Sequence, residues 1–234
     1  MGREEGIYFG PSYMLVSTLF SSRPTAKRGT IVKVKNWMIK KVITIGKGAT
    51  VQDALKLMKK HSIRHLPVVE ENDKSSIAGL VTEGGLRQFF FLSMVENISV
   101  QDAMVINPIT IEPHANVELA AGLIHRHKIG CLPVVEKKKL VGIITTTDIL
   151  AAFIEMMGLL KASSRIDLEL KGEEGSIEEI SRIVKENDSE IISIGIVNQS
   201  PRKKLQYIRL QKCDPEPIVK SLERHGYKVV SVMR

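Results

Sequence analysis

Four segments in the middle of the chain carry the apolar spacing of helices. Residues 50–60 and 116–127 have apolar side chains at three- and four-residue intervals, which predicts two amphipathic helices. Residues 86–95 and 148–159 are mostly apolar over a helical length. We expect these last two helices to pack inside an assembly rather than to face water.

Short apolar runs that end at polar turns lie between the predicted helices. Residues 66–69 are followed by a second run at 77–81, and residues 132–135 are followed by one at 140–144. Runs of this length bounded by turn residues predict strands, and each pair predicts a β-hairpin.

These elements form an internal repeat. Residues 63–69, Ile-Arg-His-Leu-Pro-Val-Val, match residues 129–135, Ile-Gly-Cys-Leu-Pro-Val-Val, at an offset of 66. The same offset aligns 42–45 with 108–111, which predicts a first strand in each repeat. The offset falls to 63 after the first hairpin turn, because loops absorb changes in length at little cost. Each repeat therefore has the predicted order strand, helix, strand, strand, helix.

A different pattern begins at about residue 165. Its elements follow the order βαββαβ, which is the ferredoxin-like split arrangement. Ser176, with Glu179 three residues later, predicts a capping box at the start of the first helix. The predicted elements are strands 165–170, 190–198, 205–211 and 227–233 and helices 176–187 and 215–225.

Composition places the chain among soluble globular proteins, with 43% hydrophobic and 26% charged residues in 234. Its two cysteines, Cys131 and Cys213, lie far apart in no ligand-like spacing, which argues against a disulfide framework or zinc site. The apolar stretch 13–20 is too short to cross a bilayer, and its acidic leading segment does not fit a signal peptide. We therefore expect a cytoplasmic protein without membrane contact.

The positive charge is concentrated at the beginning of the chain. Residues 1–41 hold eight basic and two acidic side chains, a net +6 of the total +8, so the remaining body is nearly neutral. Residues 1–30 fit neither repeat and are predicted to be a flexible extension, a start placed too far upstream or a partner-binding arm. Nucleic-acid binding through this head and the basic turn 202–204 is one alternative function, but 5% aromatic residues provide few stacking platforms.

Each repeat resembles a cystathionine-β-synthase (CBS) domain, and the last seventy residues resemble an ACT domain. The order is similar to that of acetoin-utilisation-protein-like CBS–ACT proteins. The resemblance implies an α/β fold, in which a CBS pair of two β-α-β-β-α repeats precedes a ferredoxin-like βαββαβ ACT domain. It also implies a homodimer formed through the CBS pairs. The predicted domains are an extension at 1–30, repeats at 31–96 and 97–162, and an ACT-like domain at 163–234.

In this family, adenosyl ligands occupy clefts between the two repeats. The resemblance assigns Thr145 and Asp148 to the ligand, since a hydroxyl at a helix N-terminus suits a phosphate and a carboxylate accepts from a ribose diol. The other interpretation of this pair is a helix capping box. The apolar cradle for the base is assigned to the first repeat, with Ile143 below the base. Its members are Met38, Ile43, Ile63, Arg64 and His65.

The pseudo-symmetric second site departs from the family pattern. Thr82 is followed by Gly85 where the ribose-binding aspartate would stand. We therefore expect this site to be weaker, empty or filled by a different ligand. Its cradle is assigned to Met104, Ile109, Ile129, Gly130 and Cys131. In the ACT-like domain, two glutamates crowd the turn 171–176, which favours a dimerisation or relay role without a ligand of its own.

Catalytic and metal signatures are not found in the sequence. The phosphate-loop pattern fails at 46–50, because Lys41 stands where the earlier glycine is needed and Gly48 where Ser or Thr is needed. His125 and His127 are two residues apart on a predicted helix and point to different faces. No nucleophile elbow or triad motif is present, so we assign no catalytic residue and no metal site.

The sequence therefore predicts a non-enzymatic regulatory protein that senses an adenine-containing nucleotide and relays the signal through dimer and ACT contacts. The candidate regulatory ligands are AMP, ADP, ATP and S-adenosylmethionine, of which AMP and ATP are favoured. The alternatives are nucleic-acid binding by the basic head and a role as regulatory subunit of a metabolic enzyme or transporter.

Overall fold

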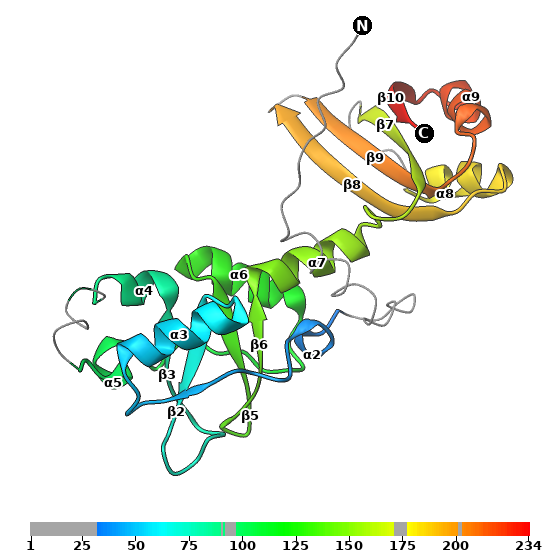
Figure 1. The fold of residues 1–234 in the computed structure, drawn as a ribbon. Helices are drawn as coiled ribbons and strands as arrows, with labels where there is room; N and C mark the ends of the chain where they lie inside the picture. The colour runs from blue at the N-terminus through cyan, green and yellow to red at the C-terminus, as the bar shows by residue number, and fades with distance from the viewer. Residues whose placement is uncertain (1–31, 90, 92–96, 171–176, 201–202) are drawn as a thin grey trace, which may run out of the picture. The chain divides into compact units, whose positions relative to one another are not determined.

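The computed structural model describes residues 32–89, 91, 97–170, 177–200 and 203–234 of the chain (Figure 1). The element order along the described residues contains two related β-hairpins, each next to helices, followed by a four-stranded antiparallel sheet with two helices. The hairpins β2–β3 and β5–β6 are those that the repeat predicts.

The first repeat begins with a short helix and contains one hairpin. Helix α3 starts after Thr50, whose side chain accepts from the N–H of Asp53 while the Asp53 carboxylate accepts from Thr50 in return. It ends at Ser62, which takes the left-handed conformation. The elements are α2 (Val34–Trp37), β1 (Ile45–Gly46), α3 (Val51–His61), β2 (His65–Val69), β3 (Ile77–Thr82) and α4 (Glu83–Arg87).

The second repeat has the same design. Helix α6 ends at Lys128, which is left-handed like its counterpart Ser62, and helix α7 begins after the capping residue Thr145. The elements are α5 (Val100–Ala103), β4 (Val105–Ile106), α6 (Val117–His127), β5 (Cys131–Glu136), β6 (Lys139–Thr145) and α7 (Thr146–Met156).

Each of the two repeats pairs its entry segment with the hairpin of the other. Strand β4, at the entry to the second repeat, pairs antiparallel with β3 of the first repeat, in register Gly79↔Ile106. In the opposite sense, Ile39, in the entry segment of the first repeat, pairs with Ile143 of β6. Each hairpin is therefore extended by a segment of the other repeat, which fixes the two hairpins relative to each other.

Two details of the predicted repeat are wrong. The helix predicted at 86–95 begins earlier, at Glu83, because Thr82 caps it, and it gives way to a turn at Gln88 and Phe89. Residues 90 and 92–96 of that prediction lie outside the described residues. The first strands predicted at 42–45 and 108–111 are also shorter, since β1 holds only Ile45 and Gly46 and the second repeat has only the bridge Ile111↔Val134.

The C-terminal domain has the predicted ferredoxin-like order. Its sheet runs β10-β7-β9-β8, and one apolar core joins the sheet to both helices, with Ile166 and Ile208 from strands against Ile183 and Leu222 from helices. The predicted capping residue Ser176 lies outside the described residues. The elements are β7 (Ser163–Leu170), α8 (Ile177–Glu186), β8 (Ile191–Ser200), β9 (Lys203–Gln211), α9 (Glu216–Arg224) and β10 (Lys228–Met233).

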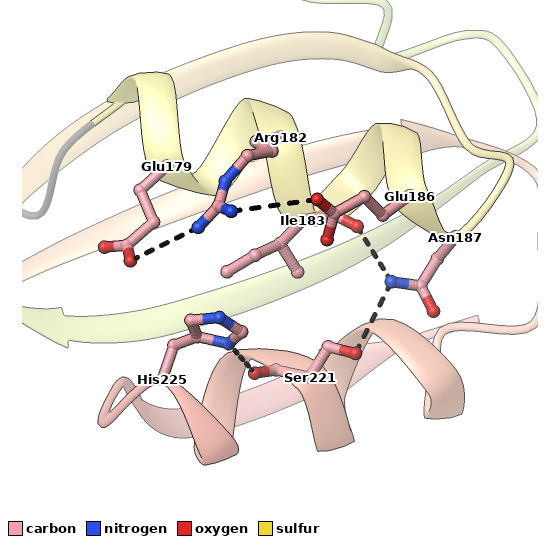
Figure 2. Close-up of polar contacts among 7 residues, drawn as sticks. All are labelled: Glu179, Arg182, Ile183, Glu186, Asn187, Ser221 and His225. Carbon is pink, nitrogen blue, oxygen red and sulfur yellow. Dashed lines mark hydrogen bonds and ion pairs between the residues drawn. The ribbon is translucent and has the colours of Figure 1, made fainter.

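Polar contacts close the surface between α8 and α9 (Figure 2). The Asn187 amide donates to the carbonyl of Ile183 at 2.8 Å and to the Ser221 hydroxyl at 3.5 Å, and His225 Nδ1 donates to the Ser221 carbonyl at 2.8 Å. Arg182 lies between two glutamates of α8 at 3.8 and 3.9 Å. Exposed pairs at such distances contribute little, so this domain is held together by its apolar core.

Candidate functional site

A cavity of about 990 Å³ lies between the two repeats. Its floor is apolar, because Leu80 of the first hairpin packs against Cys131 and Ile143 of the second, with Val42 beside them. Both repeats contribute walls, so neither repeat forms the cavity alone. A volume of this size is typical of small-molecule sites.

The cavity brings together most of the residues that the sequence assigned to ligand binding. Six residues of the first predicted site line the cavity, and we call this site the first half-site. Five of the six residues of the weaker predicted site, the second half-site, line it as well. The first group is Ile43, Ile63, Arg64, His65, Ile143 and Thr145, and the second is Thr82, Ile109, Ile129, Gly130 and Cys131. Their binding roles remain predictions.

Met38, Met104 and Asp148 do not line the cavity. Met38 instead lies against the second hairpin, so that a Cβ on Gly142 would stand 2.6 Å from its Sδ. Asp148 is only 6% exposed and forms a capping box: its Oδ2 accepts from the N–H of Thr145 at 3.0 Å and from the Thr145 hydroxyl at 2.7 Å. The capping box that the sequence also allowed is therefore present in the structure. A contact between Asp148 and a ligand stays a prediction.

The start of helix α7 faces the cavity through three threonines. Thr146 donates from its N–H and from its hydroxyl to the Gly130 carbonyl, both at 3.1 Å, and the N–H of Asp148 donates to the Thr145 hydroxyl at 3.4 Å. The N–H of Thr147 has no such partner among the described residues, and Thr147 lines the cavity. The first turn of this eleven-residue helix therefore offers a donor to an anion.

The second half-site is built on the same plan with less polar chemistry. Thr82 caps helix α4 by accepting from the N–H of Gly85 at 3.0 Å. The N–H of Glu83 donates to the Arg64 carbonyl at 2.9 Å, as that of Thr146 does to Gly130. No carboxylate stands at position 85, so the acceptor present at Asp148 has no counterpart here.

Positive charge predominates along the cavity. Lys41, Arg64, Arg87 and Lys128 line it, together with one carboxylate among the described residues, Glu83. Glu83 is already paired with Arg87 at 3.0 Å. Lys41, Arg64 and Lys128 form no ion pair with any residue that the structure describes, so the cavity holds three uncompensated cations and suits an anion.

The sequence interpretation missed Lys41, Glu83, Arg87 and Lys128. Lys41 was counted with the basic head, whereas the structure places it in the cavity, and Lys33 of the same head donates to Asn116 at 2.9 Å. The repeat offset is the sequence signal that relates Lys128 to the cavity. It aligns Lys128 with Ser62, which ends α3 and also lines the cavity.

Two titratable side chains at the cavity floor are shifted toward their neutral forms. Burial, and then the charge of Arg64, lower the pKa of His65 below its ordinary value of 6.5. Burial raises the pKa of Cys131 to about 12, so this thiol stays protonated at neutral pH. No group of three His, Cys, Asp or Glu in the described part of the chain could hold a metal ion.

Comparison with known proteins identifies relatives of the two repeats. The model of the CBS domain family matches residues 34–91 and 100–155. A CBS domain-containing protein of Dictyostelium discoideum is 36% identical over 138 residues, which are 54% of this chain and 94% of the relative. Homoserine O-acetyltransferase of Methanococcoides burtonii is 38% identical over 123 residues, 51% of this chain but only 24% of the enzyme. The match therefore spans about a quarter of the length of this enzyme, but nearly the whole length of the Dictyostelium protein.

Solved structures resemble the same part of the chain. An acetoin utilization protein, AcuB, described from Vibrio cholerae is 32% identical with a TM-score of 0.50, over 56% of this chain and 96% of that one. CBSX2 of Arabidopsis thaliana, solved in complex with AMP, is 27% identical with a TM-score of 0.49, over 53% of this chain and 97% of that one.

No helix in the described ranges is long and apolar enough to cross a membrane.

Proposed function

The chain belongs to the CBS-domain family, and from this premise we propose that it is a regulatory protein that binds an anionic adenine nucleotide in the cavity between its repeats. The signal of occupancy would pass to a partner chain or to the C-terminal domain. A ligand can send such a signal only if it binds two states of the protein with different affinities.

The observation that carries the proposal is the pairing of apolar walls with uncompensated positive charge in one cavity. Ile43 and Ile63 in the first half-site provide surface for a purine ring, and Ile143 lies on the floor. Arg64 and Lys41 are lining cations with no carboxylate partner among the described residues. A base on apolar side chains and a phosphate beside cations and a helix N-terminus are what these groups would recognise.

The same charges rank the candidate ligands. AMP and ATP bring phosphate charge, which the three free cations attract, whereas S-adenosylmethionine brings a sulfonium cation near them. We therefore propose that AMP or ATP is preferred over S-adenosylmethionine. In the first half-site, Thr145 and Asp148 would serve the phosphate and ribose, for which Asp148 must give up part of its capping role.

We propose no catalytic activity for this chain. The enzymes among its relatives match it over about a quarter of their length, so their activities do not transfer to it. The ferredoxin-like C-terminal domain, proposed here as an ACT domain, would act as the relay or dimerisation unit. The assemblies that we propose are a homodimer formed through the CBS pairs and a complex with an enzyme or a transporter.

The test is calorimetric titration of the full chain with AMP, ATP and S-adenosylmethionine at one fixed salt concentration. We expect AMP or ATP to bind with a dissociation constant in the micromolar range and Arg64→Gln to weaken that binding about tenfold or more. Arg126→Gln is the matched control, since Arg126 is exposed on α6 outside the cavity. If none of the three ligands binds, or both variants behave alike, the proposal is wrong.

A further inference from the structure

His65 of the first repeat lies directly against the backbone of the second repeat. A Cβ added to Gly130 would overlap the imidazole, reaching Nε2 and standing 2.8 Å from Cε1. The ring therefore occupies space that any side chain at position 130 would fill. Position 130 is the counterpart of Arg64, and Cys131 is the counterpart of His65, so the pseudo-symmetry of the cavity is broken at this contact.

The contact places the imidazole where the two half-sites meet. His65 belongs to the first half-site and Gly130 to the second, and both line the one cavity. The Gly130 carbonyl also anchors Thr146 at the start of α7, so the ring lies next to the segment that presents the helix N-terminus. A ligand in either half-site comes close to this ring.

The groups that face the cavity with His65 are mostly positive. Burial, and then the charge of Arg64, its neighbour in the chain, lower the pKa of His65 below its ordinary value in the absence of a ligand. The other titratable groups along the cavity are Lys41, Glu83, Arg87, Lys128 and Cys131. Because Glu83 is paired with Arg87, no free carboxylate among the described lining residues stabilises an imidazolium.

We propose that an anionic ligand enters this cavity together with a proton, and that His65 is the residue that takes up the proton. The inference rests on the proposed function of the cavity and adds a regulator, the pH, to it. A phosphate supplies the negative charge that the cavity lacks and offsets the field of Arg64 at the ring. The imidazolium then donates to the ligand or balances its charge, which the neutral ring does less well.

Linkage fixes the direction of the effect. A ligand that raises the pKa of His65 binds more tightly as the pH falls from neutral, by at most about tenfold per pH unit for one proton. Adenosine carries the same base and ribose without phosphate, so it should not raise the pKa. The protein would thus report nucleotide and acidity as one combined signal.

The experiment is an NMR pH titration of the imidazole Cε1–H signals of the full chain, free and saturated with AMP. His65→Gln assigns the His65 signal, and we expect AMP, but not adenosine, to raise its pKa. Calorimetry in two buffers of different ionisation enthalpy should show proton uptake on AMP binding that His65→Gln removes. His127→Gln, exposed on α6, is the control that should keep the uptake.

The outcomes separate the two proposals. If AMP binds and the pKa of His65 does not rise, this inference is overturned while the proposed function stands. If the uptake persists in His65→Gln, the proton belongs to the phosphate, whose own second pKa is about 6, and the inference is again overturned. If AMP does not bind at any pH, the proposed function itself fails. If His65→Gln does not fold, His→Gln variants of the other five histidines assign the His65 signal by elimination, and the wild-type titration still gives its pKa.

Discussion

Ile39 and Ile143 exchange two backbone hydrogen bonds across the repeats, from the N–H of Ile39 at 2.9 Å and from the N–H of Ile143 at 3.0 Å. The equivalent pair in the other direction is Val105 with Leu80. Both residues of each pair line the cavity. The walls of the site are therefore tied together by main chain, and neither repeat is expected to keep its shape without the other.

These crossings require small residues on the hairpins, which leads to the first prediction. A Cβ on Gly79 would stand 2.9 Å from the Val105 carbonyl, and one on Gly142 would stand 3.1 Å from the Ile39 carbonyl. Because main chain cannot give way as a side chain does, we expect Gly79→Ala to cost about 1–3 kcal/mol of unfolding free energy, and Gly142→Ala less.

The matched control is Gly122→Ala. Gly122 lies within helix α6, and a Cβ there would meet no atom within 4 Å. Alanine should therefore stabilise the protein by about 0.5–1 kcal/mol, because glycine weakens a helix interior. Urea unfolding of the three variants checks the ranking, and an equal loss at Gly79 and Gly122 would contradict the crossing as the cause.

A second prediction separates the two roles of Asp148. Asp148 with Thr145 and Asp53 with Thr50 form the same capping box, but Thr145 lines the cavity and Asp53 lies on the exposed side of α3. Asp148→Ala and Asp53→Ala should each cost about 1 kcal/mol of stability through the lost cap.

Only Asp148→Ala should also weaken AMP binding, by about tenfold, if its carboxylate accepts from the ribose. Thermal unfolding and calorimetry of both variants give the two quantities independently. Unchanged AMP affinity in both would leave Asp148 as a helix cap alone.

The sequence predicted the hairpins well because the two runs are copies of each other, and both bury their Leu-Pro-Val segment, residues 66–68 and 132–134. It did not predict the crossing of Ile39, because a single bridged residue has no periodicity to detect. Strand β4 is only two residues long, so it too has no periodicity that the sequence could reveal.

Most residues that the family pattern assigned to the site line the cavity, but Met38, Met104 and Asp148 do not, and the lining cations Lys41, Arg87 and Lys128 were missed. Lys41 and Lys128 belong to no periodic element, since Lys41 precedes the short strand β1 and Lys128 is the left-handed residue that ends α6. Their position in the cavity follows from how the repeats pair, which is a tertiary property. The packing of His65 on Gly130 is of the same kind.

The third prediction concerns the two thiols. Cys131 is 1% exposed and burial raises its pKa to about 12, whereas Cys213 is partly exposed. Because the thiolate is the reactive form, a thiol-specific disulfide reagent should label Cys213 of the native protein and leave Cys131 unmodified. Mass spectrometry of the labelled protein identifies the site, and denaturant should expose the second thiol. Labelling of Cys131 at the rate of Cys213 would contradict its burial.

The last prediction follows from the sign of the His65 shift. Without a ligand the folded-state pKa of His65 lies below the unfolded value of about 6.5, so the unfolded chain binds more protons between these two values. Stability should therefore fall as the pH drops below about 6.5 and level off below the folded-state pKa. His65→Gln should lose this part of the acid sensitivity, as measured by unfolding midpoints across that range.

A bound anionic nucleotide should reverse that sign, because a raised folded-state pKa makes the folded protein the better proton acceptor. With saturating AMP, the wild-type protein should gain stability relative to His65→Gln as the pH falls through about 6.5. His127→Gln is the control for the remaining histidines, since this side chain is exposed on α6 and does not line the cavity. If the wild-type protein and His65→Gln show parallel pH profiles with and without AMP, His65 neither resists nor accepts the proton.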